Sequence, residues 1–168
     1  MGLNSLRDVL QEQLVDLHST EAQLVEALPK MAGAAHNEEL RDAFEHHLEE
    51  TRGHLKRVDE ALGELGIPVP TEVSKGMKGL VEEGEKVIAK DGDANAKDVA
   101  LIGAAQRVEH YEIAGYGTAR QLADDLGLDD IRDLMDQTLD EESEADKKLT
   151  KIATGGMLKS GVNKEASS

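Results

Sequence analysis

Apolar residues recur every three or four positions along four long stretches of the chain, at about residues 4–34, 37–65, 96–125 and 129–154. In the first stretch, Leu10, Leu14 and Leu17 fall on one side of a helix. This spacing matches the 3.6-residue period of an α-helix and predicts four amphipathic helices. Pro29 lies inside the first stretch, where it either kinks the helix or ends it early.

Start and stop signals separate the four stretches. Asn37 is a good N-cap for the second stretch, "GIPVP" ends it after Leu65, and Gly127 and Gly155 follow the third and fourth. Short connections join the first to the second and the third to the fourth, so each pair is predicted to form an antiparallel hairpin. About 30 residues separate the hairpins, and they contain a shorter predicted helix at about residues 71–89.

This order of elements predicts an all-α fold. Aromatic residues make up only 2% of the chain, which favours packed helices over sheets. Two helical hairpins joined by a long crossover with a short fifth helix form the ferritin-like four-helix arrangement. We assign this bundle to residues 1–154 and predict that residues 155–168, "GGMLKSGVNKEASS", form a disordered tail.

Composition narrows the range of partners and locations. The net charge is −16, from 35 acidic and 19 basic residues, and such a surface repels nucleic acid and anionic lipid. The absence of cysteine excludes disulfides and thiolate metal sites. The sequence shows no secretory signal and no apolar run of the roughly 18 residues that a membrane span needs. We therefore predict a cytoplasmic protein that binds neither nucleic acid nor membranes.

Several carboxylates and imidazoles fall on the apolar faces of the predicted helices, where a core normally holds leucine. Glu21, for example, lies between Leu17 and Leu24 in the register of the first helix. Each of the four helices contributes at least one such residue. The candidates are Glu21 on the first helix; His47, Glu50 and His54 on the second; Glu109 and Glu112 on the third; and Glu142 and Asp146 on the fourth.

The strongest candidates are predicted to lie at one level. Glu21 precedes the first hairpin turn, near position 36, by 15 residues, and Glu50 follows it by 14. Glu109 and Glu142 flank the second turn, near position 127, at 18 and 15 residues. A helix rises about 1.5 Å per residue, so these four carboxylates should meet in the middle of the bundle.

Clustered carboxylates in a core repel one another, and each costs several kcal/mol to desolvate without a partner. Two metal ions bridged by carboxylates and completed by imidazoles would remove this cost, as in the dinuclear sites of helical bundles. Oxygen-rich ligands with one or two imidazoles favour iron or manganese over structural zinc. We therefore predict that the candidate residues hold two Fe or Mn ions.

Some assignments stay open on the sequence alone. We expect one of His47 and His54 to be a ligand and the other to support it. Glu141 replaces Glu142 if the fourth helix is rotated by one residue. Tyr111 and Tyr116 either hydrogen-bond a ligand, donate an electron or simply fill the core. The competing interpretation of the whole set is a solvated charged face, since 32% of the residues are charged.

Three segments resemble the YciE/YciF-type ferritin-like family of bacterial stress proteins: "AFEHHLEETRGHLKRVDEALGELG", "ALIGAAQRVEHYEIAGYGTARQLADDLG" and "LDEESEADKKLTKIA". The likeness covers about residues 3–153. It implies a rubrerythrin-related four-helix bundle, a dinuclear metal site and dimerisation. Glu109 and Glu112 match the Glu-x-x-Glu of that pattern's third helix, whereas Gly53 and Ala145 stand where its Glu-x-x-His motifs would place histidine.

The leading functional hypothesis is a stress-associated homodimer that binds this metal pair and reacts with peroxide or dioxygen, with enzymatic turnover left open. The alternative is a non-catalytic acidic protein that acts through dimerisation or by docking a partner. The segment "SKGMKGLVEEGEKVIAK" carries apolar residues at near-helical spacing, including Met77, Leu80 and Ile88. These residues either cover the protein's own core or meet a second subunit.

Overall fold

The computed structural model describes residues 2–156 and 159–167, most of which are helical. The principal elements are α1 Leu6–Ala34, α2 Glu38–Glu64, α3 Lys75–Ile88, α4 Ala94–Asp125 and α5 Asp129–Thr154. The predicted helical fold is therefore confirmed. Because α1 runs through Pro29 to Ala34, the proline does not end the helix. Among the described residues, no helix is both long and apolar enough to cross a membrane.

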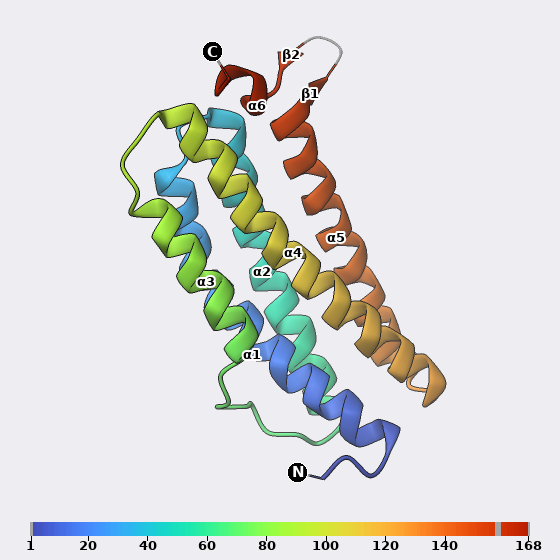
Figure 1. The fold of residues 1–168 in the computed structure, drawn as a ribbon. Helices are drawn as coiled ribbons and strands as arrows, with labels where there is room; N and C mark the ends of the chain where they lie inside the picture. The colour runs from blue at the N-terminus through green and yellow to red at the C-terminus, as the bar shows by residue number, and fades with distance from the viewer. Residues whose placement is uncertain (1, 157–158, 168) are drawn as a thin grey trace.

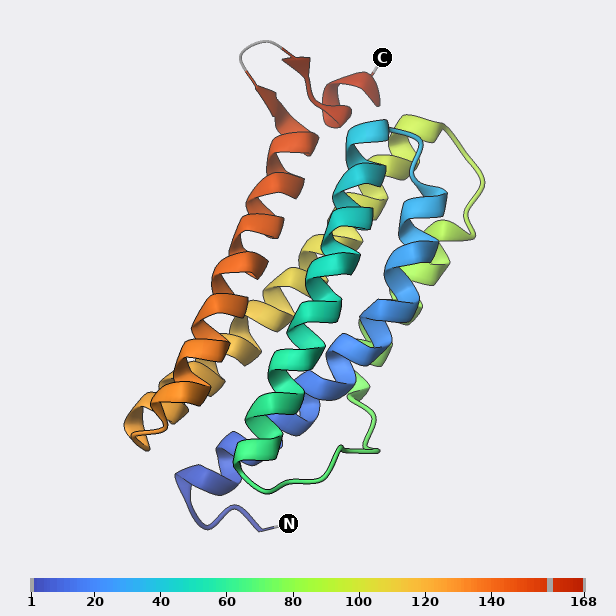
Figure 2. The ribbon, with the colours of Figure 1, turned by 180° about the vertical axis from the view of Figure 1, so that it is seen from behind.

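Four long helices, α1, α2, α4 and α5, lie side by side (Figure 1). α1 and α2 run in opposite directions, as do α4 and α5, whereas α2 and α4 both run toward the end of the molecule that holds the N-terminus (Figures 1 and 2). α3 connects α2 to α4 along the chain, runs back in the opposite direction, and packs against α1 and α4. The two hairpins contact each other through α2 with α5 and through α1 with α4.

Side-chain caps determine where the first four helices begin. Ser5, Asn37, Ser74 and Asp93 each accept a hydrogen bond from the backbone N–H three residues later. Such a cap stabilises a helix by about 1 kcal/mol. Between α4 and α5, Gly127 has a φ of 68°, the left-handed conformation that glycine adopts without strain at a helix end.

The apolar core is divided into two clusters along the helices. One cluster, which includes Phe44, lies nearer the α1–α2 turn, and the other, which includes Ile131, lies nearer the α4–α5 turn. Along α1, Leu17 belongs to one cluster and Leu24 to the other, and the fully buried Glu21 lies between them. A polar layer therefore crosses the middle of the four long helices, and it is the layer that the sequence predicts.

Residues 155–156 and 159–167 form regular elements, which differs from the disordered tail predicted for residues 155–168; positions 157, 158 and 168 lie outside the described residues. β1, Gly155–Gly156, pairs antiparallel with β2, Lys159–Ser160, and the short helix α6, Val162–Glu165, follows. α6 contacts α4 and α5, and Val162 is 2% exposed in the core cluster that contains Phe44. The sequence pattern did not predict α6, because one apolar side chain in so short a segment leaves no periodicity to detect.

Candidate metal centre

Six ionisable side chains meet in the polar layer between the two core clusters. Each is 5% exposed or less. The helical phase that buries the leucines of each helix also buries these residues, because they occupy the same apolar stripe. They are Glu21 from α1, His47 and His54 from α2, Glu109 and Glu112 from α4, and Glu142 from α5.

These side chains form two groups that share one carboxylate. The ligand atoms lie within 4.8 Å of one another in the group His47, Glu109, Glu112 and Glu142, and likewise in the group Glu21, His54 and Glu142. The two oxygens of Glu142 face different imidazoles. Oε2 is 3.5 Å from Nε2 of His47, and Oε1 is 2.8 Å from Nδ1 of His54. A carboxylate in this position is able to bridge two ions.

Most inward-facing polar atoms of the layer make no hydrogen bond of acceptable geometry in the part of the chain that the structure describes, although Glu142 lies within ion-pair distance of both imidazoles. They include both oxygens of Glu112 and of Glu142, and one oxygen each of Glu21 and Glu109. Nε2 of His47 and Nδ1 of His54 belong to the same set. A buried polar atom left without a partner costs about 1–3 kcal/mol. Cations bound among these atoms would satisfy all of them together, so the residues fit a metal centre.

A further carboxylate holds each imidazole on its outward side. Nδ1 of His47 is 3.3 Å from Oε2 of Glu50, and Nε2 of His54 is 2.9 Å from Oε2 of Glu141. Arg57 donates two hydrogen bonds, of 2.8 and 2.9 Å, to the Glu141 carboxylate. A metal-binding histidine typically donates its second ring N–H to such a carboxylate. Both rings are therefore oriented with their other nitrogen toward the candidate centre.

Burial and like charges disturb the carboxyl groups of the metal-free protein. Burial raises the pKa of Glu112 well above its ordinary value, and repulsion from Glu142 and Glu21 raises it further. Burial also raises the pKa of Glu109 well above the ordinary value, although the nearby His47 opposes this shift. Carboxyl groups in such surroundings keep their protons to higher pH unless a cation takes the place of those protons.

The two imidazoles are shifted in the direction that favours their charged form. Burial alone would lower the pKa of His54, but the adjacent Glu142 and Glu21 carboxylates outweigh it and raise that pKa to about 10. At His47, burial is likewise outweighed by the charge of Glu109 and the bond to Glu50, and the pKa is raised. Because a protonated ring nitrogen cannot bind a metal, ion binding must displace protons from this layer.

Tyr116 resolves one of the alternatives left open by the sequence. The residue is fully buried, and its hydroxyl donates a hydrogen bond to Oε1 of Glu21. Burial and the Glu21 charge raise the pKa of the phenol well above its ordinary value, so the hydroxyl remains a donor. Oε2 of Glu21 is left facing Nδ1 of His54, at 3.7 Å. Tyr116 therefore orients a candidate ligand as well as filling space.

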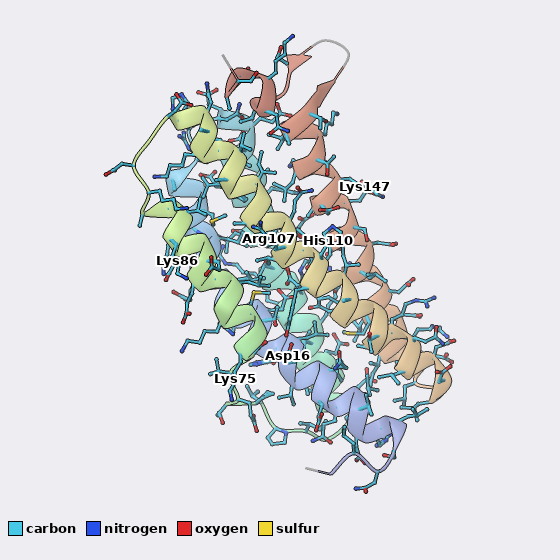
Figure 3. All side chains as sticks on the ribbon, in the orientation of Figure 1. Asp16, Lys75, Lys86, Arg107, His110 and Lys147 are labelled. Carbon is cyan, nitrogen blue, oxygen red and sulfur yellow. The ribbon has the colours of Figure 1, made fainter. Side chains whose placement is uncertain are left out.

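Glu50 and Asp146 lie outside both groups, although the sequence nominates them as ligands. The Glu50 side chain is 27% exposed and sits on the outer side of His47. Asp146 is 21% exposed and lies 3.4 Å from His110, which projects from α4 (Figure 3). Asp146 also accepts a hydrogen bond of 3.0 Å from Gln106. Both carboxylates border the layer from its solvent side.

Arg57 is a neighbour of the centre that the sequence did not reveal, and Glu141 is the alternative to Glu142 that the sequence left open. Glu142 points inward and is fully buried, whereas the Glu141 side chain is 27% exposed and faces Arg57. Helix α5 is therefore not rotated by one residue. Arg57 follows His54 by three positions and shares its helix face, which was the available signal for a charge partner beside that imidazole.

A polar groove leads to the layer from solvent. It lies between α2 and α5 and has a volume of about 470 Å³. Its lining includes Glu50 and Lys147, and it reaches His47 and Glu109 of the candidate centre. Figure 3 shows Lys147 projecting from α5. Hydrated ions and polar molecules therefore have a route to the layer.

Comparison with known families places residues 5–166 in the family described as "Domain of unknown function (DUF892)". The chain belongs to this family. Among curated proteins, it is similar to Protein YciF of Escherichia coli (strain K12), with 42% identity over 165 residues that cover 98% of this chain and 99% of that protein. The resemblance inferred from the sequence is therefore confirmed.

Solved structures agree with the DUF892 assignment. The crystal structure of the E. coli stress protein YciF matches with a TM-score of 0.85 and 43% identity, covering 88% of this chain and 94% of that one. The structure described as "YcfI, a putative structural protein from Rhodopseudomonas palustris" matches with a TM-score of 0.85 and 36% identity, covering 89% of this chain and 96% of that one. A Xanthomonas campestris protein shares the fold, with a TM-score of 0.70 at 23% identity over 88% and 89% of the chains.

Proposed function

We propose that this DUF892 protein is a ferritin-like metalloprotein that binds a pair of iron or manganese ions in the polar layer. The observation that carries the proposal is the set of buried, inward-facing oxygen and nitrogen atoms that make no hydrogen bond among the described residues. The parallel course of α2 and α4, with α3 as the return, supports the ferritin-like arrangement (Figure 1).

The residues divide naturally between two ions. His47, Glu109 and Glu112 would hold one ion, Glu21 and His54 the other, and Glu142 would bridge them. This donor set is rich in oxygen and has one imidazole per ion, which suits iron or manganese. The departure from the Glu-x-x-His pattern at Gly53 and Ala145 is then compensated by His47 and His54, which reach the layer from other turns of α2.

A pair of ferrous or manganous ions would supply two electrons, enough with two protons to reduce hydrogen peroxide to water or dioxygen to hydrogen peroxide. The protein's own residues bind and orient the pair, exclude bulk water from it, and release protons as the ions enter. YciF is described as a stress protein, and we extend that role to this chain. Stress protection through removal of an oxidant is the function that this chemistry supports.

The homodimer and the cytoplasmic location belong to the same proposal. Leu3, Leu6, Val69 and Val73 are between 50% and 67% exposed near the start of α1 and in the α2–α3 connection. Apolar residues of this size on an otherwise highly charged surface provide a region that a second copy of the chain could cover. Sedimentation of the purified protein would give its oligomeric state directly.

Metal analysis of matched variants tests the metal centre. Protein from cultures supplemented with iron and manganese is analysed by ICP-MS as wild type, Glu142→Gln and Glu144→Gln. Glu144 is an exposed residue of the same helix, with its side chain 74% exposed, so it controls for the loss of one acidic charge. We expect about two ions per chain, as in dinuclear carboxylate sites, in the wild type and the control, and fewer than half as many in Glu142→Gln.

The same experiment decides against the proposal if wild type and Glu142→Gln both contain no metal while circular dichroism shows both folded. The buried carboxyl groups would then be protonated, and Glu142→Gln would be the more stable of the two. That result would favour a non-catalytic interaction protein, which agrees with the description of YcfI as "a putative structural protein".

A further inference from the structure

A second opening reaches the candidate centre from the side opposite the polar groove. It is an apolar cavity of about 40 Å³ enclosed by α1, α3 and α4, the three helices that lie together in Figures 1 and 3. Its walls are almost entirely carbon. The residues that define it include Leu24, Leu28, Val81, Gly84, Ala105 and Val108.

The cavity connects the surface with the polar layer. Lys30 and Glu85 line its outer part, where their side chains are 56% and 48% exposed and form an ion pair of 2.7 Å. His47 and Glu109 line its inner part, where both are nearly inaccessible to solvent. A molecule inside the cavity would therefore lie next to the group of His47, Glu109, Glu112 and Glu142.

Size and polarity restrict what this cavity can hold. A water-sized sphere needs about 10–15 Å³ of such volume, and cavities without polar partners stay dry and accept apolar molecules such as xenon. The cavity therefore has room for a small molecule of two or three atoms. The walls offer almost no hydrogen bonds, so a hydrated ion or hydrogen peroxide would lose its water contacts on entering. The groove between α2 and α5, which is lined by charged residues, is the more favourable route for those solutes.

We propose that this cavity is a binding site for a small apolar molecule of the dioxygen class, which is held beside the metal pair and kept apart from the polar route. The inference deepens the proposed function and rests on it, because the metal pair that would react with the bound molecule belongs to that proposal. The two routes end at the same residues, His47 and Glu109. The structure thus separates an apolar oxidant from ions and peroxide by the chemistry of the two walls.

Gly84 is the residue that keeps the cavity open. It is buried on α3, and the nearest atom to a Cβ built at this position is Sδ of Met31, at 3.8 Å. A small side chain therefore enters the cavity without meeting backbone. Glycine inside a helix is less favourable than alanine, so the glycine lowers the stability of α3 while it leaves the cavity empty. A valine at 84 would fill that space.

The test compares Gly84→Val with Gly79→Val, a matched change on the same helix. A Cβ at Gly79 meets nothing within 4 Å, and the residue is exposed, so both variants carry the same cost in helix propensity. Xenon is added to the metal-free proteins, and methyl chemical shifts are followed by NMR. We expect saturable shifts at Leu28 and Val108 in the wild type and in Gly79→Val, and none in Gly84→Val.

A second measurement uses the iron-loaded proteins. The rate of ferrous oxidation is recorded with dioxygen and, separately, with hydrogen peroxide under argon. We expect Gly84→Val to slow oxidation by dioxygen about tenfold, equivalent to about 1.4 kcal/mol of activation free energy, and to change the peroxide rate less than twofold. Gly79→Val should change neither rate.

Two outcomes would overturn the inference. One is the absence of xenon-dependent shifts in the folded wild-type protein. The other is an equal effect of Gly84→Val on both oxidants. If the proposed metal centre is wrong, the wild-type protein will contain no metal. The xenon experiment uses metal-free protein, so it still decides whether the cavity binds an apolar molecule.

Discussion

Two fully buried carboxylates of α4, Asp98 and Glu112, have opposite surroundings. Asp98 lies beside the α1–α2 connection, where its oxygens accept hydrogen bonds from the backbone N–H groups of His36, at 2.9 Å, and Asn37, at 2.7 Å. Glu112 lies in the polar layer, and neither of its oxygens has a hydrogen-bond partner within residues 2–156 and 159–167. The fold itself supplies the hydrogen-bond donors of one buried carboxyl group and, among the described residues, supplies none to the other.

The difference separates a carboxylate that the fold satisfies from one that we propose to be a metal ligand. Asp98 joins α4 to the first hairpin, and its two donors are always present because they belong to the backbone. Glu112 is surrounded by other carboxylates, which raise its pKa after burial has already done so. Under the proposed function, a cation is the partner that such an arrangement lacks. The following experiments test this distinction.

The largest effect is expected at Asp98. The change Asp98→Ala removes two charge-assisted hydrogen bonds and leaves two backbone N–H groups without their acceptor. We expect a loss of about 3 kcal/mol in the free energy of unfolding, equally large with and without metal. Urea denaturation of both forms measures it. A loss that appears only in the metal-loaded form would mean that Asp98 serves the metal centre, contrary to the comparison.

An intermediate effect is expected at Glu141, which has the donors that Glu112 lacks. The change Glu141→Gln weakens the hold on Nε2 of His54 but leaves the inward ligands in place. We expect metal affinity to fall about 10–100-fold, the usual cost of losing the carboxylate behind a metal-bound histidine. Competition with a chelator of known affinity gives the value, with Glu144→Gln as the control. An unchanged affinity would show that His54 is not a ligand.

The smallest effect is a dependence of stability on pH in the metal-free protein. The pKa of Glu112 is raised on folding, so its contribution to stability is lost as pH rises above the unfolded value of about 4.3. The pKa of His54 is raised to about 10, so its contribution is complete below about 6.5 and is lost as pH rises toward 10. Both shifts have the same sign, and the melting temperature should fall between pH 6 and pH 9.5.

Two comparisons sharpen this pH measurement. Glu112→Gln removes one of the repelling charges, so it should melt at a higher temperature than wild type at pH 9 when both are free of metal. Metal-loaded wild type should show a flatter pH profile, because cations replace the bound protons. Glu50 and Glu141 have lowered pKa values and therefore act below this range. A metal-free melting temperature that rises toward pH 9.5 would contradict the assignment.

The local pattern was sufficient to predict the helices and the faces that they bury. α2 begins after the predicted cap at Asn37, and α4 begins at Ala94, close to the predicted start at 96. The same periodicity placed Glu21, Glu109 and Glu142 inside, and all three are buried. This succeeded because helical phase is a property of the local sequence, and long apolar stripes determine it without knowledge of the neighbouring helices.

The periodicity did not predict which residues of a buried stripe point into the layer and which turn outward. Glu50 shares the stripe of His47 and His54, yet it turns outward and contacts the outer nitrogen of His47. A stripe is about 100° wide, so periodicity could not separate a residue at its edge from one at its centre. Asp98 was not recognised at all, because its donors lie about 60 residues earlier in the chain, at separations of 62 and 61 positions.

The amino-acid sequence by itself determined the helical fold, the polar layer in its middle and the family, because periodicity and residue type are written locally. Tertiary structure decided which carboxylates face inward, which ones support His47 and His54, and how α6 covers the end of the core. It also decided that α3 packs with Gly84 facing α1 and α4, which leaves an apolar cavity beside the layer. These features arise where segments distant in sequence meet, and their geometry follows from packing that no single segment specifies.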